Sequence, residues 1–137
     1  MNHSPETQDA LPRPHDRSLR WPMAASALWA AAIFAVSSVP GSNVPGRFGY
    51  LAHFVEYGVL GALLAVGLGR RRDPVGRALV AIALASAYAV TDEIHQFFVP
   101  GRSTDPLDWL ADTAGALVAV AIVSSVTAWR HRRRPDQ

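Results

Sequence analysis

The segment that decides the fold ends in Asp92-Glu93-Ile94-His95-Gln96-Phe97-Phe98-Val99-Pro100-Gly101-Arg102, directly after an uncharged apolar run over residues 78–91. That run has 14 residues, whereas a helix needs about 20 to cross the hydrocarbon core of a bilayer. A membrane span here must therefore include Asp92, Glu93 and His95. A charged side chain near the centre of a membrane helix costs about 2.5 to 3.5 kcal/mol, so ionisable groups in such a helix indicate function by default.

The composition fits one membrane domain. The chain has 137 residues, 50% of them hydrophobic, which suits a single domain without a second one. It has no cysteine, and this excludes disulfides, thiolate metal sites and cysteine nucleophiles. All 13 basic residues are arginines, in short clusters between apolar runs, as in loops at a membrane surface. We therefore expect a lipid bilayer, and no nucleic acid, among its partners.

Four apolar segments are each close to a membrane span in length, and short linkers with proline, glycine and arginine join them. Connections this short place consecutive helices side by side and antiparallel. The sequence therefore predicts an all-α membrane protein, a four-transmembrane-helix up-down bundle. The predicted helices are residues 20–39, 50–69, 75–98 and 106–129.

The arginines predict the orientation. Eleven of the 13 would lie on one side of the membrane, and only Arg47 and Arg102 on the other. Because the arginine-rich side is normally cytoplasmic, we expect cytoplasmic N and C termini in a multi-pass protein of the cell membrane. Residues 1–18 are predicted to be a disordered cytoplasmic tail, residues 19–130 the membrane domain, and residues 131–137 a basic cytoplasmic tail. The first apolar segment also has features of a signal peptide, but its length favours a retained span.

This topology brings scattered polar residues to one level. At a rise of about 1.5 Å per residue, Glu56 and Asp92 both lie roughly 21 to 23 Å above the arginines at the inner ends of their helices. Spacings of three and four residues then place the neighbouring polar side chains on matching helix faces. We expect three helices to form one outward-facing polar pocket. Its predicted residues are His53, Glu56, Tyr57, Asp92, Glu93, His95, Gln96, Arg102, Asp108 and Asp112.

Small residues permit the helices to approach closely. The pattern of small residues four apart is typical of membrane helices in contact. We interpret these residues as packing positions rather than as a site. They are Ala81, Ala85 and Ala89 in the third segment and Ala111, Gly115 and Ala119 in the fourth, with Gly58, Gly61, Ala62 and Ala65 in the second.

Several polar residues also have structural interpretations. Asp105 precedes Pro106 and is predicted to cap the fourth helix. Asp108 could face the free amides of the same helix end or the pocket, whereas Asp112 lies one turn deeper, where no cap is needed. The pocket carboxylates could also form an interhelical network that only fixes the bundle. Glu93 points about 100° away from Asp92 around the helix, so we expect it to face the lipid headgroups or the first helix.

The turn at Pro100-Gly101-Arg102 is predicted to hold the arginine over the mouth of the pocket. A guanidinium group there suits a phosphate or a carboxylate. Arg102 could instead extend to the interface or pair with Asp105 or Asp108. Histidines and carboxylates together could bind a divalent metal, but no spacing such as His-Glu-x-x-His is present. The sequence therefore predicts neither a metal site nor a cofactor.

Three motifs follow one another along the chain: His53-Phe54-x-Glu56-Tyr57-x-x-Leu60-Gly61, then Asp92-Glu93-Ile94-His95-Gln96-x-Phe98-x-Pro100-Gly101-Arg102, then Asp108-x-x-x-Asp112-x-x-Gly115. Their order and spacing strongly resemble the VanZ-like family of bacterial membrane proteins, over about residues 20–125, and Ser37-Ser38-x-Pro40 is similar to it as well. Two positions depart from the family. Tyr50 stands where members usually have lysine, and Asp112 where many have asparagine. The site of this chain therefore carries more negative charge.

The resemblance implies a role like that of the family's namesake, which is linked to resistance to the glycopeptide teicoplanin. We expect a membrane protein that acts at the outer face of the membrane on the cell envelope, with a lipid-linked cell-wall intermediate or a glycopeptide as partner. Three mechanisms stay open. The pocket could bind or move an envelope lipid or small anion; it could be a hydrolase or transferase site with Glu56, Asp92 and His95 as general acid and base; or the protein could be a structural scaffold. Enzyme activity, the ligand and the oligomeric state stay open too.

Overall fold

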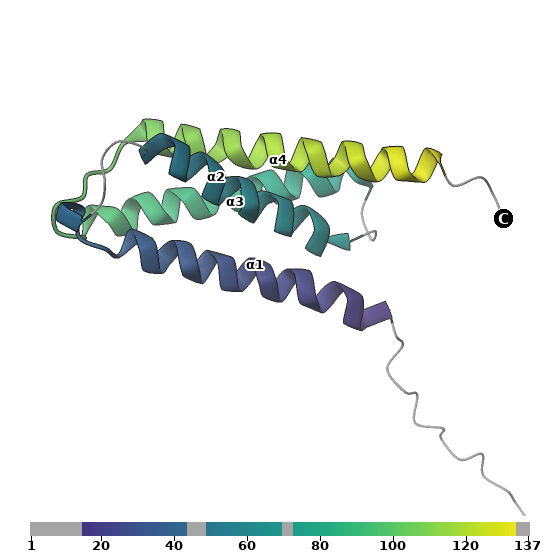
Figure 1. The fold of residues 1–137 in the computed structure, drawn as a ribbon, viewed down its shortest axis with the longest axis horizontal. Coiled ribbons are helices and arrows are strands. Elements are labelled where there is room, and N and C mark those ends of the chain that lie inside the picture. Colours follow the sequence, from purple (N-terminus) through teal and green to yellow (C-terminus); the bar gives the residue numbers. More distant parts are fainter. Residues whose placement is uncertain (1–14, 44–48, 70–72, 134–137) are drawn as a thin grey trace, which may run out of the picture.

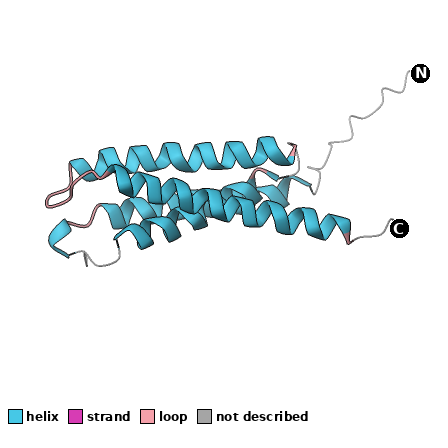
Figure 2. Ribbon diagram, turned by 90° about the horizontal axis from the view of Figure 1, so that it is seen from above, coloured by secondary structure: helices cyan, strands magenta, loops and turns pink. Residues whose placement is uncertain are grey.

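The computed structural model describes residues 15–43, 49–69 and 73–133. Within these ranges the protein has four α-helices and no strand (Figure 2). The helices are α1 (His15–Ser37), α2 (Gly49–Gly67), α3 (Pro74–Phe97) and α4 (Pro106–Arg132), and a short 3-10 helix, η1 (Gly41–Asn43), follows α1. The predicted all-α fold is confirmed.

Consecutive helices run in opposite directions, and the start of α1 and the end of α4 lie at the same end of the bundle (Figure 1). The observed helix ends differ from the predicted ones by at most three residues, except at the start of α1. There the helix includes residues 15–18, which the sequence analysis placed in a disordered tail. These residues include neither glycine nor proline, so nothing in them ends a helix. The rest of that tail, and residues 134–137 of the basic tail, lie outside the described residues.

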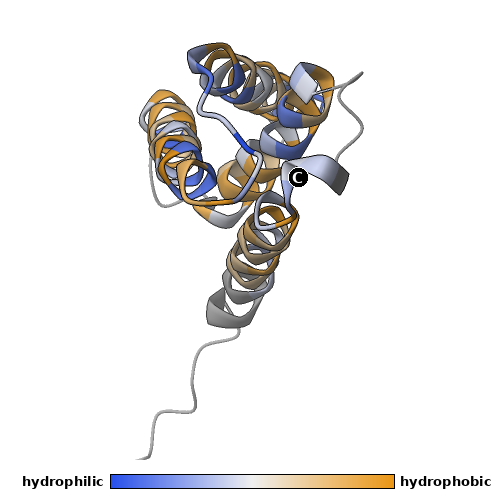
Figure 3. Cartoon of the chain, turned by 90° about the vertical axis from the view of Figure 1, so that its left-hand side faces the viewer, coloured by the Kyte–Doolittle hydropathy of each residue, from blue (hydrophilic) through white to orange (hydrophobic). Residues whose placement is uncertain are grey.

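Three helices, α2, α3 and α4, are long and apolar enough to cross a membrane. The apolar part of α1, Trp21–Ser37, is shorter. The outer faces of the helices carry large exposed apolar side chains, a property of surfaces that contact lipid rather than water. Hydrophilic residues concentrate instead near the helix ends and connections (Figure 3).

The closest helix approach is between α2 and α4, the pair with the most extensive contact. A Cβ atom at Gly115 would collide with the carbonyl oxygen of Phe54, and one at Gly61 would lie 2.9 Å from the Cα atom of Ala116. Only glycine permits this backbone distance. The small residues predicted for packing therefore do pack.

Helix α1 packs against α2, where Gly67 approaches the backbone of Met23, and side-chain hydrogen bonds add to this contact. The Tyr88 hydroxyl donates to the carbonyl oxygen of Ala30 at 2.7 Å, and the Trp29 ring nitrogen donates to that of Glu56 at 2.9 Å. On α3, the three alanines spaced four residues apart are fully buried, with Ala81, Ala85 and Ala89 all 0% exposed. The most extensive helix contacts in the bundle are therefore those of α4 with α2 and α3, and α1 contacts mainly α2 (Figure 1).

Candidate functional site

The predicted site residues gather at the end of the bundle that holds the α1–α2 and α3–α4 connections. They come from the start of α2, the end of α3, the start of α4 and the turn before α4. We call this group, together with the two serines at the end of α1 described below, the polar site. Its members are Ser37, Ser38, His53, Glu56, Tyr57, Asp92, Glu93, His95, Gln96, Arg102, Asp108 and Asp112.

Asp105 caps α4, as the sequence predicts. Its carboxylate accepts a hydrogen bond from the backbone N–H of Leu107 at 2.9 Å, and Pro106 is the first helical residue. The Tyr50 hydroxyl donates to the other Asp105 oxygen at 3.0 Å. Because Asp105 performs the capping, Asp108 is available to the polar site, and its Oδ2 lies 3.8 Å from His53 Nε2.

The centre of the polar site is the pair His53–Asp112. His53 Nδ1 lies 3.0 Å from Asp112 Oδ1, and Asp112 is 0% exposed. Gly115 lies one turn further along α4, so the close approach of α2 and α4 there brings the two side chains into hydrogen-bonding distance. The His53–Asp112 pair therefore depends on the close packing of the α2 and α4 backbones at Gly115.

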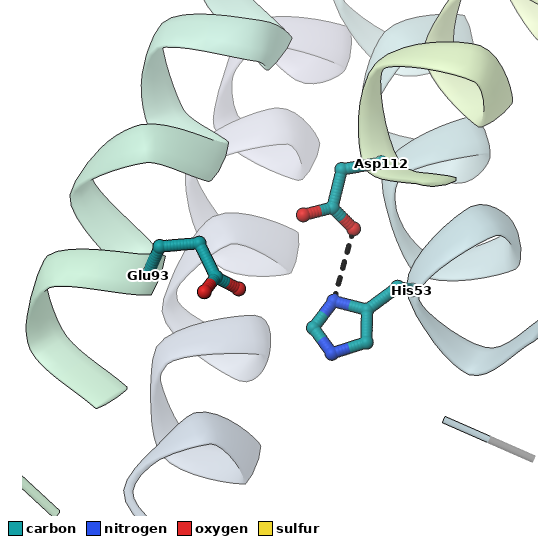
Figure 4. A group of neighbouring side chains, drawn as sticks. All are labelled: His53, Glu93 and Asp112. Atoms are coloured by element: carbon teal, nitrogen blue, oxygen red, sulfur yellow. Dashed lines mark hydrogen bonds and ion pairs between the residues drawn. The ribbon is translucent and has the colours of Figure 1, made fainter. Parts of the chain in front are cut away.

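Glu93 was predicted to belong to the pocket and to face the headgroups or the first helix, and the second expectation is wrong. It instead faces α4, and its Oε2 accepts a hydrogen bond from the backbone N–H of Asp105 at 3.0 Å. Glu93 does point away from Asp92 around the axis of α3, but the helix that lies on that side of α3 is α4. Glu93, His53 and Asp112 each offer an atom suited to metal coordination, and these three atoms lie within 4.8 Å of one another (Figure 4).

Asp92 faces α1 and forms the second hydrogen-bonded group of the polar site. Its Oδ2 accepts from the Ser37 hydroxyl at 2.8 Å and from the Gln96 amide at 3.1 Å. Asp92, Gln96 and Ser37 are all buried. The pocket predicted from the sequence consisted of three helices without α1, so Ser37 was not among its predicted residues.

His95 also faces α1, at a more exposed position. Its Nε2 lies 2.9 Å from the Ser38 hydroxyl, and its ring stacks on Phe34 with a centroid distance of 4.2 Å. Ser37 and Ser38 carried a signal in the sequence, because they are adjacent hydroxyls at the end of an apolar run. They lie at the level of the polar residues in the other helices.

Glu56 and Tyr57 lie between these two groups. The Glu56 carboxylate is half-buried and interacts electrostatically with His53, Asp92 and Asp112. Tyr57 is fully buried, and its ring lies 6.1 Å from that of Tyr88. Glu56 therefore links the His53 side of the site with the Asp92 side, and Tyr57 lies one residue further into the bundle.

Arg102 follows a turn that is tied to the α1–α2 connection. Gly101 adopts a φ of 74°, which favours glycine, and the carbonyl oxygen of Pro100 accepts a hydrogen bond from Gly41 N–H at 3.1 Å. The Arg102 guanidinium group interacts electrostatically with Glu56 and Asp108. Its Nε atom is buried and has no hydrogen-bond partner among the described residues.

The polar site has more acidic groups than basic ones. Its five carboxylates face one arginine and two histidines. Three of the carboxylates have a buried oxygen that lacks a hydrogen-bond partner within the described part of the chain: Asp92 Oδ1, Glu93 Oε1 and Asp112 Oδ2. Buried oxygens of this kind need a proton, a cation or a donor such as water beside them. The site can therefore bind positive charge at its carboxylates and negative charge at Arg102.

Comparison with known proteins identifies the family. No curated protein and no solved structure matches the chain. The VanZ/LLP1 family model, in contrast, matches residues 3–127, a range that includes the whole polar site and nearly all of the four helices. Members of that family are membrane proteins, in agreement with three helices that can span a bilayer. The chain therefore belongs to the VanZ/LLP1 family and is a membrane protein.

Proposed function

We propose that this protein spans the cytoplasmic membrane several times and binds or moves an anionic envelope lipid, or another small anion, at its outer face, with a role like that of glycopeptide (teicoplanin) resistance proteins. The observation that carries the proposal is Arg102. Its Nε donor is buried, has no partner among the described residues, and lies at the end of the site that faces the connections. A phosphate or carboxylate group of a lipid-linked cell-wall intermediate would satisfy that donor through the planar guanidinium fork.

The arginines of the described helices support the orientation. Arg77, at the start of α3, and Arg130, Arg132 and Arg133, at the end of α4, share one end of the bundle, and Arg102 lies at the other. The positive-inside rule assigns the first end to the cytoplasm and the polar site to the outer face. Lipid-linked envelope intermediates and glycopeptides meet at that face.

The orientation can be tested with single cysteines, because the chain has none of its own. Ser103→Cys places a thiol in the exposed α3–α4 connection, and Val75→Cys is the matched control at the exposed start of α3. We expect a membrane-impermeant maleimide to label Ser103→Cys in intact cells and Val75→Cys only after the cells are opened. The reverse pattern would exclude the proposed orientation.

The binding function can be tested with Arg102→Ala. We expect normal membrane abundance but a loss of teicoplanin tolerance, and at least a 10-fold weaker binding of a polyprenyl phosphate to the purified protein in native mass spectrometry. Arg102→Lys keeps the charge but not the fork, so it should recover part of the binding. Arg130→Ala, at the other end of the bundle, is the control and should bind like the unaltered protein. Equal binding by all three variants would exclude the proposed role of Arg102.

A membrane-embedded hydrolase or transferase acting on a lipid-linked headgroup is the second candidate, and the His53–Asp112 pair favours it. A buried carboxylate that orients one ring nitrogen leaves the other nitrogen to act as a base. In this arrangement His53, rather than His95, is the better placed base. Mass spectrometry of envelope lipids incubated with the protein tests this candidate, since an enzyme must change a lipid mass. Lost tolerance at normal abundance in Arg102→Ala would exclude the third candidate, a purely structural scaffold.

A further inference from the structure

We propose that His53, Glu93 and Asp112 bind a divalent transition-metal ion, of the Zn²⁺ or Mn²⁺ class, between α2, α3 and α4. The sequence did not indicate such a site, because each ligand comes from a different helix and no local spacing records it. The proposal goes beyond the lipid-binding function and does not depend on it.

The geometry of the three side chains is close to that of a coordination site. One atom of each lies within 4.8 Å of the others. Atoms that ligate one ion at about 2.1 Å are at most about 4.2 Å apart, so the side chains need to close by less than about 1 Å. Figure 4 shows that the three side chains come from three helices and converge on one space.

A second observation points to a ligand in that space. Asp112 is 0% exposed, and its Oδ2 has no hydrogen-bond partner among the described residues. Figure 4 shows this carboxylate beside His53, to which Oδ1 is bonded, with its second oxygen on the side of Glu93. Glu93 Oε1 is likewise buried and without a partner in the described ranges. Buried carboxylate oxygens without donors in one cluster repel each other, and a cation among them reduces that repulsion.

The surroundings hold the three side chains in place, as they do around metal ligands in general. The backbone N–H of Asp105 orients Glu93 at 3.0 Å, and Asp108 Oδ2 lies 3.8 Å from His53 Nε2. A groove of about 260 Å³ between α3 and α4 is lined by Glu93, Asp105 and Trp109 among others. This groove borders Glu93 at the side of the bundle.

The donor set selects the class of metal. One imidazole and two carboxylates suit Zn²⁺ or Mn²⁺ better than the thiolate-preferring ions, and the chain has no cysteine. Asp92 also has a buried oxygen without a partner, but no group of three potential ligands includes it within the described residues. The prediction is therefore specific to the α2–α3–α4 side of the polar site.

The test measures metal binding by the full chain, purified in detergent through a histidine-free tag and stripped with a chelator. We expect one Zn²⁺ or Mn²⁺ per chain in equilibrium dialysis, and electron paramagnetic resonance of the Mn²⁺ form should show coupling to an imidazole nitrogen. Glu93→Gln and Asp112→Asn should each weaken binding by at least about 10-fold, and His53→Gln should remove the nitrogen coupling. Asp92→Asn is the matched control and should bind within about 2-fold of the unaltered chain, the usual scatter of such comparisons.

Each result decides the proposal. The absence of stoichiometric metal binding would overturn it and leave a shared proton as the occupant of the space. Binding that is unchanged in Glu93→Gln, or weakened as much in Asp92→Asn, would also overturn it. Should Asp112→Asn not fold, Glu93→Gln still decides, because the glutamine keeps an oxygen to accept from Asp105 N–H. Metal binding without binding of the polyprenyl phosphate would support this site and contradict the proposed function. Binding of the polyprenyl phosphate without metal binding would support the proposed function and contradict this site.

Discussion

The two sides of the polar site each contain a fully or almost fully buried aspartate, but they are built differently. Asp112 on α4 meets a histidine of α2 where glycines bring the two backbones together. Asp92 on α3 meets two neutral donors, one of them Ser37 on α1, a helix that makes few contacts with α3. Backbone packing therefore fixes the first side and polar contacts fix the second. Steric substitutions should damage the α2–α4 side, and removal of single hydrogen bonds should affect the α1–α3 side only mildly.

The largest expected effect comes from Gly115→Val. Any Cβ atom here collides with the backbone of Phe54, which cannot move aside as a side chain can. We expect α2 and α4 to separate, the His53–Asp112 pair to break, and the free energy of unfolding to fall by at least about 3 kcal/mol. Unfolding by denaturing detergent and membrane abundance measure the effect. Ala114→Val is the control at the adjacent exposed position and should behave like the unaltered chain.

The second prediction compares the two aspartates directly. Asp112→Ala leaves a buried His53 nitrogen without its partner, so we expect a loss of about 2 to 3 kcal/mol. Asp92→Ala should cost only about 1 kcal/mol, because Ser37 and Gln96, already 3.4 Å apart, can bond to each other. Unfolding of both variants under the same conditions gives the comparison. A larger loss of unfolding free energy in Asp92→Ala than in Asp112→Ala would contradict the view that backbone packing fixes the α2–α4 side and polar contacts fix the α1–α3 side.

The structure also indicates which properties of the fold and site were predictable. Helix lengths and the Asp105–Pro106 cap depend on nearby residues, and the sequence predicted them within a few positions. The level of the polar residues followed from helix rise alone. The direction of Glu93 did not, because it depends on which helix lies beside that face of α3. Position along a helix is a local property, whereas the neighbour of a helix face is not.

The role of α1 was missed for a related reason. Its two serines lie in the Ser37-Ser38-x-Pro40 segment that resembles the family, but the sequence contains no spacing that pairs them with α3, more than 50 positions away. His53, Glu93 and Asp112 each lie in one of the three sequence motifs, but no spacing in the sequence shows that one atom of each comes within 4.8 Å of the others. That proximity depends on how the three helices pack.

The third prediction addresses the α1–α3 side through Ser37→Ala. The substitution removes the buried hydrogen bond to Asp92 and the longer one from Gln96 at 3.4 Å, but it leaves the one that Gln96 donates to Asp92. We expect the free energy of unfolding to fall by about 1 kcal/mol. Ser124→Ala is the matched control, because the Ser124 hydroxyl is buried without a partner among the described residues and its removal breaks no bond. An equal effect in both variants would show that Ser37 contributes only its volume.

The smallest expected effect is that of Ser38→Ala. Its hydroxyl bonds His95 at an exposed position, where water can replace it, so we expect a loss of at most about 0.5 kcal/mol. Stacking on Phe34 should keep the His95 ring in place in this variant. The same variant then separates two interpretations of His95. If teicoplanin tolerance falls while the free energy of unfolding stays the same, the Ser38–His95 hydrogen bond is needed for function. If neither quantity changes, His95 is an interfacial residue of the α1–α3 contact. The chemistry of the site then depends on the α2–α4 side.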